Sequence, residues 1–249
     1  MFCHTESASR GRMYLVPDRS ITGFFASLRM TGERVTSMIY QPPKDKPVYN
    51  LNNAYDVVKE RLLKINIERQ CRNSGAILHT NGRVLIKYLH DNYLIDPKSG
   101  DVFTEEGSLL PSFRDKILIL HYFTRAAGTP LSNKQLTFRD LPGGLVYYPT
   151  FIKRTIQPLI ETFGKSAPLL FTAGETLGAG KGEIGDASLV IRVFPRVPIT
   201  LVLWQGDEEL TPDLNLLLDA NILDYLESED VTIVCEVITW RLINAVKKA

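Results

Sequence analysis

The stretch SLVIRVFPRVPITLVLW, residues 188–204, decides the fold of the chain. Its two halves, 188–194 and 199–204, are rich in β-branched and large apolar residues, which is typical of strands. Pro195 and Pro198 lie between the halves, and proline interrupts the hydrogen-bonded ladder of a sheet. We therefore predict a strand pair with a bend that the two prolines fix.

A second β region precedes this pair, over residues 76–104. Short apolar runs alternate there with turn residues, and the pair Asn81-Gly82 favours a type I′ hairpin turn. Asp91-Asn92 and residues 97–100 are expected to form two further turns. The pattern predicts a small antiparallel β-meander.

Helical spacing and capping residues predict about five helices in the rest of the chain. Ser112 resembles a capping residue for the apolar run 117–123, and Ser228 one for the last helix. The expected helices cover about residues 52–71, 113–127, 149–163, 167–177 and 228–248. Residues 212–226 are expected to form short helical pieces. The fold class is therefore α+β, with a single mixed domain over residues 41–249.

Residues 1–40 differ from the rest in composition. They contain five arginines and no lysine, and they follow neither the strand period nor the helix period. Part of the segment, 20–34, resembles a peptide translated from bacterial intergenic repeat DNA. We expect residues 1–40 to be an unstructured or mis-annotated extension, with Met38 as the true start.

The overall composition excludes several classes of protein. The 249 residues include 29 Lys and Arg against 28 Asp and Glu, a net charge of +1, whereas dedicated nucleic-acid binders are usually basic. The apolar runs are too short to span a bilayer. Three widely spaced cysteines indicate a reducing compartment, so we expect a cytoplasmic protein that binds neither nucleic acid nor membrane.

The common nucleotide and metal motifs have the wrong context here. Gly180, Gly182 and Gly185 satisfy G-x-G-x-x-G, but a strand follows them where a dinucleotide site needs a helix, so a flexible loop is expected. No group of histidines or cysteines has the spacing of a metal site. His121 is expected to be a hydrogen-bonded core histidine, and Cys235 a small buried apolar residue. Whether the protein is an enzyme stays open.

The densest group of candidate binding residues follows Phe138. The sequence FRDLPGG (138–144) places an arginine before a tight glycine turn, and two tyrosines and a further arginine come soon after it. Guanidinium groups near exposed glycine backbone suit an anionic ligand. The alternative is that Arg139 and Asp140 brace the turn. The binding hypothesis predicts an anion-binding cleft, with one carboxylate orienting a guanidinium, formed by Arg139, Tyr148, Arg154, Asp186 and Arg196.

These residues resemble those of an uncharacterised prokaryotic family, domain-of-unknown-function family 3786. The resemblance covers about residues 50–249, and Asp140 stands where the family leads us to expect Glu. The features that carry it are FRDLPGG (138–144), Tyr148, Arg154, Gly185-Asp186, 194–204, Asp207-Glu208, Leu218-Asp219 and Tyr225-Leu226. The family implies a cytoplasmic protein, mostly of anaerobic bacteria and archaea, with no assigned activity. Some relatives carry a cysteine-rich iron–sulfur segment that this chain lacks.

Two functions are compatible with this sequence. The first is binding of a small anionic or cofactor-like ligand in the arginine-lined cleft. The alternative is a non-catalytic accessory protein that docks on an anaerobic redox or corrinoid-type enzyme. A concave site where the arginines converge would favour the first function, whereas an exposed apolar patch with the arginines paired or apart would favour the second.

Overall fold

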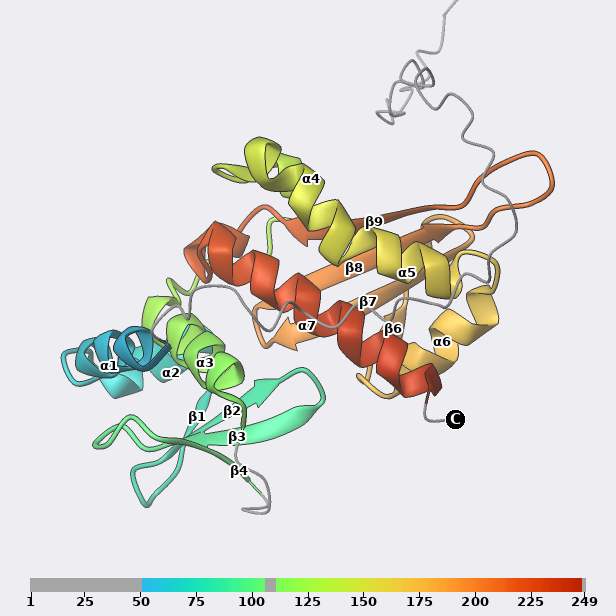
Figure 1. Ribbon diagram of the computed structural model, residues 1–249. Coiled ribbons are helices and arrows are strands. Elements are labelled where there is room, and N and C mark those ends of the chain that lie inside the picture. The colour runs from blue at the N-terminus through green and yellow to red at the C-terminus, as the bar shows by residue number, and fades with distance from the viewer. Residues whose placement is uncertain (1–50, 106–110, 248–249) are drawn as a thin grey trace, which may run out of the picture. The chain divides into compact units, whose positions relative to one another are not determined.

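The computed structural model describes residues 51–105 and 111–247. These residues form an α+β fold of two antiparallel sheets and seven α-helices, which confirms the predicted fold class (Figure 1). The expected extension 1–40 and the proposed start at Met38 lie outside this range. Among the helices that the structure describes, none is long and apolar enough to span a bilayer.

The larger sheet has five strands in the order β5-β9-β8-β7-β6. The predicted strand pair is confirmed as β7 and β8, in which Ile191 faces Ile199. The expected flexible glycine loop is partly ordered, because β6 pairs with β7 inside it. The strands are β5 (Gln135–Leu136), β6 (Gly180–Lys181), β7 (Ala187–Phe194), β8 (Val197–Trp204) and β9 (Asp213–Asp219).

The helical pieces expected over residues 212–226 are largely wrong. Strand β9 occupies most of this range and pairs with β8, and only the short 3-10 helix η2 (Ile222–Asp224) follows it. Leu214, Leu216 and Leu218 are buried while the residues between them are partly exposed, which is the two-residue period of a strand. This alternation is hidden in the sequence because Leu217, an intervening residue, is also apolar.

The smaller sheet is the predicted meander, with its four strands in chain order. The strands are β1 (Ile77–Leu78), β2 (Val84–Tyr88), β3 (Asp91–Ile95) and β4 (Val102–Thr104). In the first turn only Gly82 has a positive φ, +83°, so the predicted type I′ turn, which needs two such residues, is not formed. The second turn lies at Leu89 and His90, because Asp91 and Asn92 already pair with β2.

The helices agree with the predictions at some boundaries and differ at others. Ser112 caps α3 as predicted, accepting a hydrogen bond from the amide of Asp115 at 3.2 Å. The helix expected over 52–71 is divided in two, because Asn66 caps a new helix. The helix expected to open at Pro149 begins at Gly144 and breaks at Thr155. The helices are α1 (Leu51–Leu62), α2 (Ile67–Ser74), α3 (Phe113–Arg125), α4 (Gly144–Arg154), α5 (Ile156–Phe163), α6 (Ala167–Glu175) and α7 (Ser228–Lys247).

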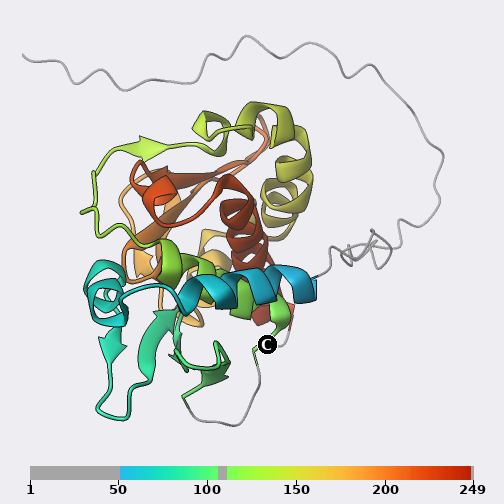
Figure 2. The same ribbon diagram turned by 90° about the vertical axis from the view of Figure 1, so that its left-hand side faces the viewer.

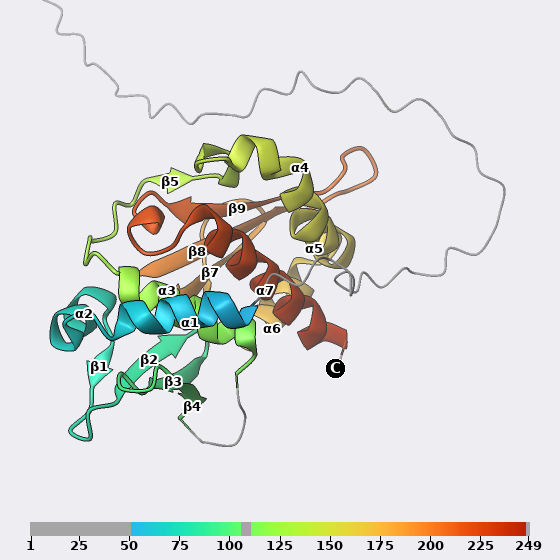
Figure 3. The same cartoon turned by 60° about the vertical axis from the view of Figure 1, so that its left-hand side comes forward.

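Helices α5, α6 and α7 pack on one face of the five-stranded sheet (Figures 1 and 3). Helix α1 runs along α3, with the meander on one side of the two helices and the larger sheet on the other (Figures 2 and 3). An aromatic stack joins these parts: the ring of Phe194 lies 4.1 Å from that of Tyr122 in α3 and 5.0 Å from that of Tyr88 in the meander. The two sheets therefore share one core.

Candidate functional site

Arg139 and Tyr148, two residues of the predicted cleft, are in contact. Arg139 lies in the 3-10 helix η1 (Phe138–Asp140), and its guanidinium carbon is 4.2 Å from the centre of the Tyr148 ring. This is a cation–π distance. The Asp140 carboxylate accepts hydrogen bonds from the amide and hydroxyl of Thr137, both at 2.8 Å, so it closes the turn, as the bracing alternative expects.

Arg154 has a carboxylate partner inside the fold. Its Nη1 lies 3.0 Å from Oε1 of Glu236 on α7, and Arg114 of α3 approaches the other oxygen at 3.9 Å. The Glu236 side chain is only 13% exposed, so its charge depends on these cations. Arg154 therefore ties α4 to α7.

The other two residues of the predicted cleft lie at opposite ends of strand β7. Asp186 precedes the strand and accepts a hydrogen bond from the amide of Gln205 at 2.7 Å, whereas Arg196 is in the turn after it. A strand of 8 residues separates its ends by roughly 25 Å. The predicted cleft of Arg139, Tyr148, Arg154, Asp186 and Arg196 is therefore not formed as one site, because the length of β7 keeps the last two apart.

A different cavity lies where the meander meets the five-stranded sheet, and we call it the junction pocket. Its volume is about 340 Å³. The walls come from the end of β2 and its turn, from the segment after α6, and from the end of β7. The residues that line it are Lys87, Leu89, His90, Leu177, Gly178, Arg192, Phe194 and Pro195.

The junction pocket exists because the β2–β3 turn is hydrogen-bonded to β7. Leu89 adopts a positive φ of +54°, which is rare for a residue with a side chain, and its amide donates to the carbonyl of Val193 at 2.7 Å. Leu89 and Phe194 are buried, so the floor of the pocket is apolar. A backbone contact between distant segments thus fixes the position of the pocket.

The rim of the junction pocket is cationic. Lys87 and Arg192 are exposed, as is His90, and none of the three forms an ion pair with any other residue in the ranges 51–105 and 111–247. No carboxylate lines the cavity. Uncompensated positive charge around a concave surface attracts anions.

Gly178 leaves room for the His90 ring. A Cβ atom built on Gly178 would lie 2.6 Å from Nδ1 of His90, so only glycine leaves room for the imidazole there. Gly178 also has a φ of +61°, which a side chain would disfavour. The imidazole therefore sits at the wall of the pocket and close to backbone.

The motifs of the sequence do not predict the junction pocket. Arg192 is the one charged residue in the strand run 188–194, and a charge in such a run is the only sequence signal that points to it. Lys87 and His90 resemble ordinary exposed residues of a hairpin. Their convergence depends on the hydrogen bond between Leu89 and Val193, which no local pattern predicts.

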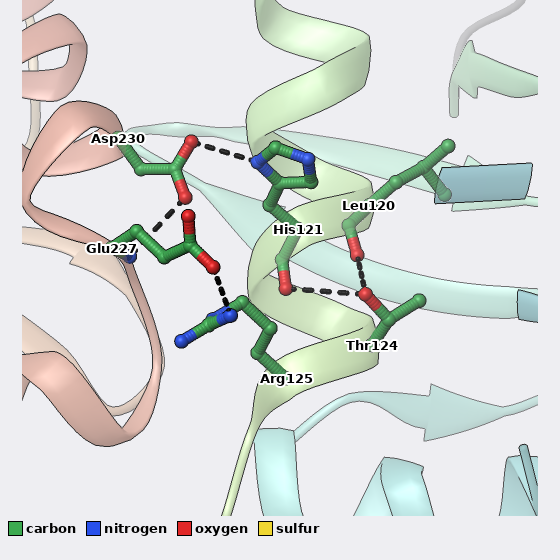
Figure 4. A network of polar contacts seen from close by, with 6 residues as sticks. All are labelled: Leu120, His121, Thr124, Arg125, Glu227 and Asp230. Carbon is green, nitrogen blue, oxygen red and sulfur yellow. Dashed lines mark hydrogen bonds and ion pairs between the residues drawn. The ribbon is translucent and has the colours of Figure 1, made fainter. Parts of the chain in front are cut away.

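A second polar group joins α3 to α7 (Figure 4). His121 Nδ1 lies 2.7 Å from Oδ1 of Asp230, and the other oxygen of Asp230 accepts from the amide of Glu227 at 3.2 Å. One turn further along α3, Arg125 is paired with the Glu227 carboxylate. The prediction that His121 is hydrogen-bonded is confirmed, although its side chain is 27% exposed and thus lies at the edge of the core.

The described cysteines are buried free thiols. Burial raises the pKa of Cys71 and of Cys235, so both thiols are protonated and poorly reactive at neutral pH. The prediction that Cys235 is buried is confirmed. In the part of the chain that the structure covers, no three His, Cys, Asp or Glu residues form a group that could hold a metal ion.

Comparison with known proteins identifies a family for this fold. A family model described as Domain of unknown function (DUF3786) matches residues 66–241. No curated protein and no solved structure matches the chain. The matched range includes all the residues that line the junction pocket, the η1–α4 region and the His121–Asp230 pair. Since it spans well over half of the chain, the protein belongs to the DUF3786 family.

Proposed function

We propose that the protein binds a small anionic molecule in the junction pocket. The observation that carries this proposal is the convergence of Lys87, His90 and Arg192 on one cavity that no carboxylate lines. Positive charge around a concave surface without a neighbouring carboxylate attracts anions. Binding of an anionic ligand, expected from the sequence at another place, is thus assigned to the meeting point of the two sheets.

The chemistry of the junction pocket indicates which anions fit. Arg192 can hold a carboxylate or a phosphate through two parallel hydrogen bonds, and Lys87 adds a compact charge. Leu89 and Phe194 offer an apolar floor for the rest of the ligand. A small molecule with one anionic group and an apolar part satisfies both features. Arg196, one residue beyond Pro195, is an exposed cation in the same turn and can add to the local field.

We also propose a cytoplasmic location. Cys71 and Cys235 are free thiols, and cysteines stay reduced in the cytoplasm of most organisms. A ligand with a carboxylate or phosphate group is consistent with this location, because such metabolites are retained inside cells by their charge.

The proposal is tested by anion binding to the purified full-length protein. Isothermal titration and thermal melts with pyrophosphate, citrate and benzoate compare the parent with the double variant Lys87→Gln/Arg192→Gln. The matched control is Arg72→Gln/Lys153→Gln, which removes the same charge from two exposed positions outside the pocket. We expect at least one anion to raise the melting temperature of the parent and of the control.

The pocket variant should bind that anion at least tenfold more weakly than the parent. An equal loss in the control variant would show that the effect comes from net charge rather than from the junction pocket. If none of the three anions binds the parent at millimolar concentration, the proposal fails.

A further inference from the structure

The first turn of α4 exposes apolar side chains to solvent. Leu145 is 71% exposed, Val146 is 88% exposed and Tyr147 is 37% exposed, and the three are consecutive. We call these three residues the α4 tip. A run of exposed apolar residues is costly for solubility, so on a folded surface it marks a place of interaction.

The backbone that carries the α4 tip is fixed. Gly143 takes a φ of +72°, and a Cβ on Gly144 would lie 2.0 Å from the carbonyl oxygen of Phe138. The ring of Phe138 stacks on that of Phe151 at 4.0 Å, which anchors the turn to the buried side of α4. The tip is therefore held in place before any partner arrives, and little conformational entropy is lost on binding.

Two exposed cations, Arg139 and Lys153, flank the α4 tip. Arg139 lies over the ring of Tyr148, and Lys153 is seven residues after Val146, so it shares the same side of the helix. Arg139 and Lys153 are both exposed, and neither forms an ion pair with another residue in the ranges 51–105 and 111–247. The nearby Asp140 carboxylate accepts hydrogen bonds from Thr137 and offsets part of this positive charge.

From this arrangement we infer that the α4 tip docks on a different protein, through a surface that presents apolar side chains rimmed by carboxylates. Aliphatic side chains gain free energy against an apolar surface but not against the phosphates of a nucleic acid. A second copy of this chain fits poorly, because its own rim of Lys and Arg would face the same charges. Tyrosine and arginine beside aliphatic residues are typical of the centre of a protein interface.

This inference goes beyond anion binding and corresponds to the accessory role that the sequence left open. It does not depend on the junction pocket, since none of the pocket residues belongs to the α4 tip or its rim. A protein could use both, with the pocket for a ligand and the tip for a partner.

The test uses site-specific photo-crosslinking in cells of the source organism. The full chain carries p-benzoylphenylalanine at position 146 and, in a matched control, at position 57, where Val57 on α1 is 68% exposed. We expect a protein adduct at position 146 that is absent at position 57. The adduct is identified by mass spectrometry, and the partner is then purified for titration against the parent and variants.

The purified partner should bind Val146→Asp at least tenfold more weakly than the parent and Val57→Asp equally well. Lys153→Glu should weaken binding several-fold, and added salt should weaken binding of the parent. Thermal melts of each variant confirm that it is folded.

Several results would overturn the inference. They are the lack of a protein adduct specific to position 146, an adduct with the same chain, an adduct with lipid or nucleic acid, and a partner whose affinity does not change in Val146→Asp. Each of them leaves the anion titrations at the junction pocket unaffected.

Discussion

Two regions of the molecule carry clusters of basic side chains, and they use them in different ways. Near α4, Arg154 is paired with Glu236 and Arg139 lies on the ring of Tyr148. At the junction pocket, Lys87 and Arg192 have no such partner among the residues that the structure describes. A cation with a partner inside the fold contributes to stability, whereas a cation without one is available to a ligand.

This difference changes how an arginine-rich motif should be interpreted. The sequence around FRDLPGG (138–144) has the denser pattern, yet Asp140 is held by hydrogen bonds and the nearby Arg154 by an ion pair. The residues of the junction pocket form a weaker sequence pattern, yet their positive charges are the more available to a ligand. Density of charged residues along the chain is therefore a poor guide to where charge is available in space.

The largest effect is expected for Gly144→Ala, which tests whether the α4 region is a structural brace. The new Cβ would meet the Phe138 carbonyl at 2.0 Å, so backbone must move, and we expect a loss of about 3 kcal/mol in the free energy of unfolding. Urea denaturation measures it. In the control Gly143→Ala nothing lies within 4 Å, and only the strain of the positive φ remains, at about 1 kcal/mol. Equal effects for the two variants would contradict the close packing of this turn.

The next largest effect on the free energy of unfolding is expected for Arg154→Met. Among the described residues, the substitution leaves Glu236, whose side chain is 13% exposed, with the more distant Arg114 at 3.9 Å as its cation, so stability should fall by about 2 kcal/mol. Urea denaturation measures this loss in the free energy of unfolding. Arg139→Met, which removes an exposed cation–π contact, should cost about 0.5 kcal/mol. If Arg154→Met is neutral, the contrast between the two regions disappears.

A smaller effect is expected at acid pH from Asp219, which fixes the loop leading to β5. Burial alone would raise its pKa, but hydrogen bonds from Asn221, Ser132 and Asn133 outweigh burial and lower the pKa below the ordinary value. A lowered folded pKa gives stability that is present above the unfolded pKa and is lost as pH falls through the folded pKa.

Urea melts of the parent and Asp219→Asn at pH 7 and pH 3 measure this contribution. The parent should be the more stable at pH 7, by about 1 kcal/mol, and the difference should shrink at pH 3. A difference that stays constant between the two pH values would show that the carboxylate charge is not what holds this loop.

The smallest effect is expected for Arg192→Ala at the junction pocket. The side chain is exposed and forms no ion pair with other described residues, so stability should change by no more than about 0.5 kcal/mol. Thermal and urea melts without added anion measure it. A loss as large as that of Arg154→Met would mean that Arg192 is a structural brace, and the comparison of the two regions would be wrong.

The local patterns of the sequence predicted much of the fold. The strand pair β7–β8, the meander and the start of α3 at Ser112 follow from side-chain alternation, turn residues and a capping hydroxyl, all within a few residues of one another. Strand β9 was missed because Leu217 obscures its alternation, and the break before α2 was missed because the apolar spacing continues across Asn66. Contacts between distant segments of the chain decide both the strand conformation of β9 and the break before α2.

The sequence by itself therefore determined the α+β class and the family, because these depend on local periods and on short motifs. Only the tertiary structure decided which charges are paired. Glu236 reaches Arg154 because α7 packs beside α4. Lys87 and Arg192 line the same pocket because Leu89 is hydrogen-bonded to Val193. Both arrangements depend on contacts between segments far apart in the chain, and the spacing of residues along a sequence carries no information about such distances.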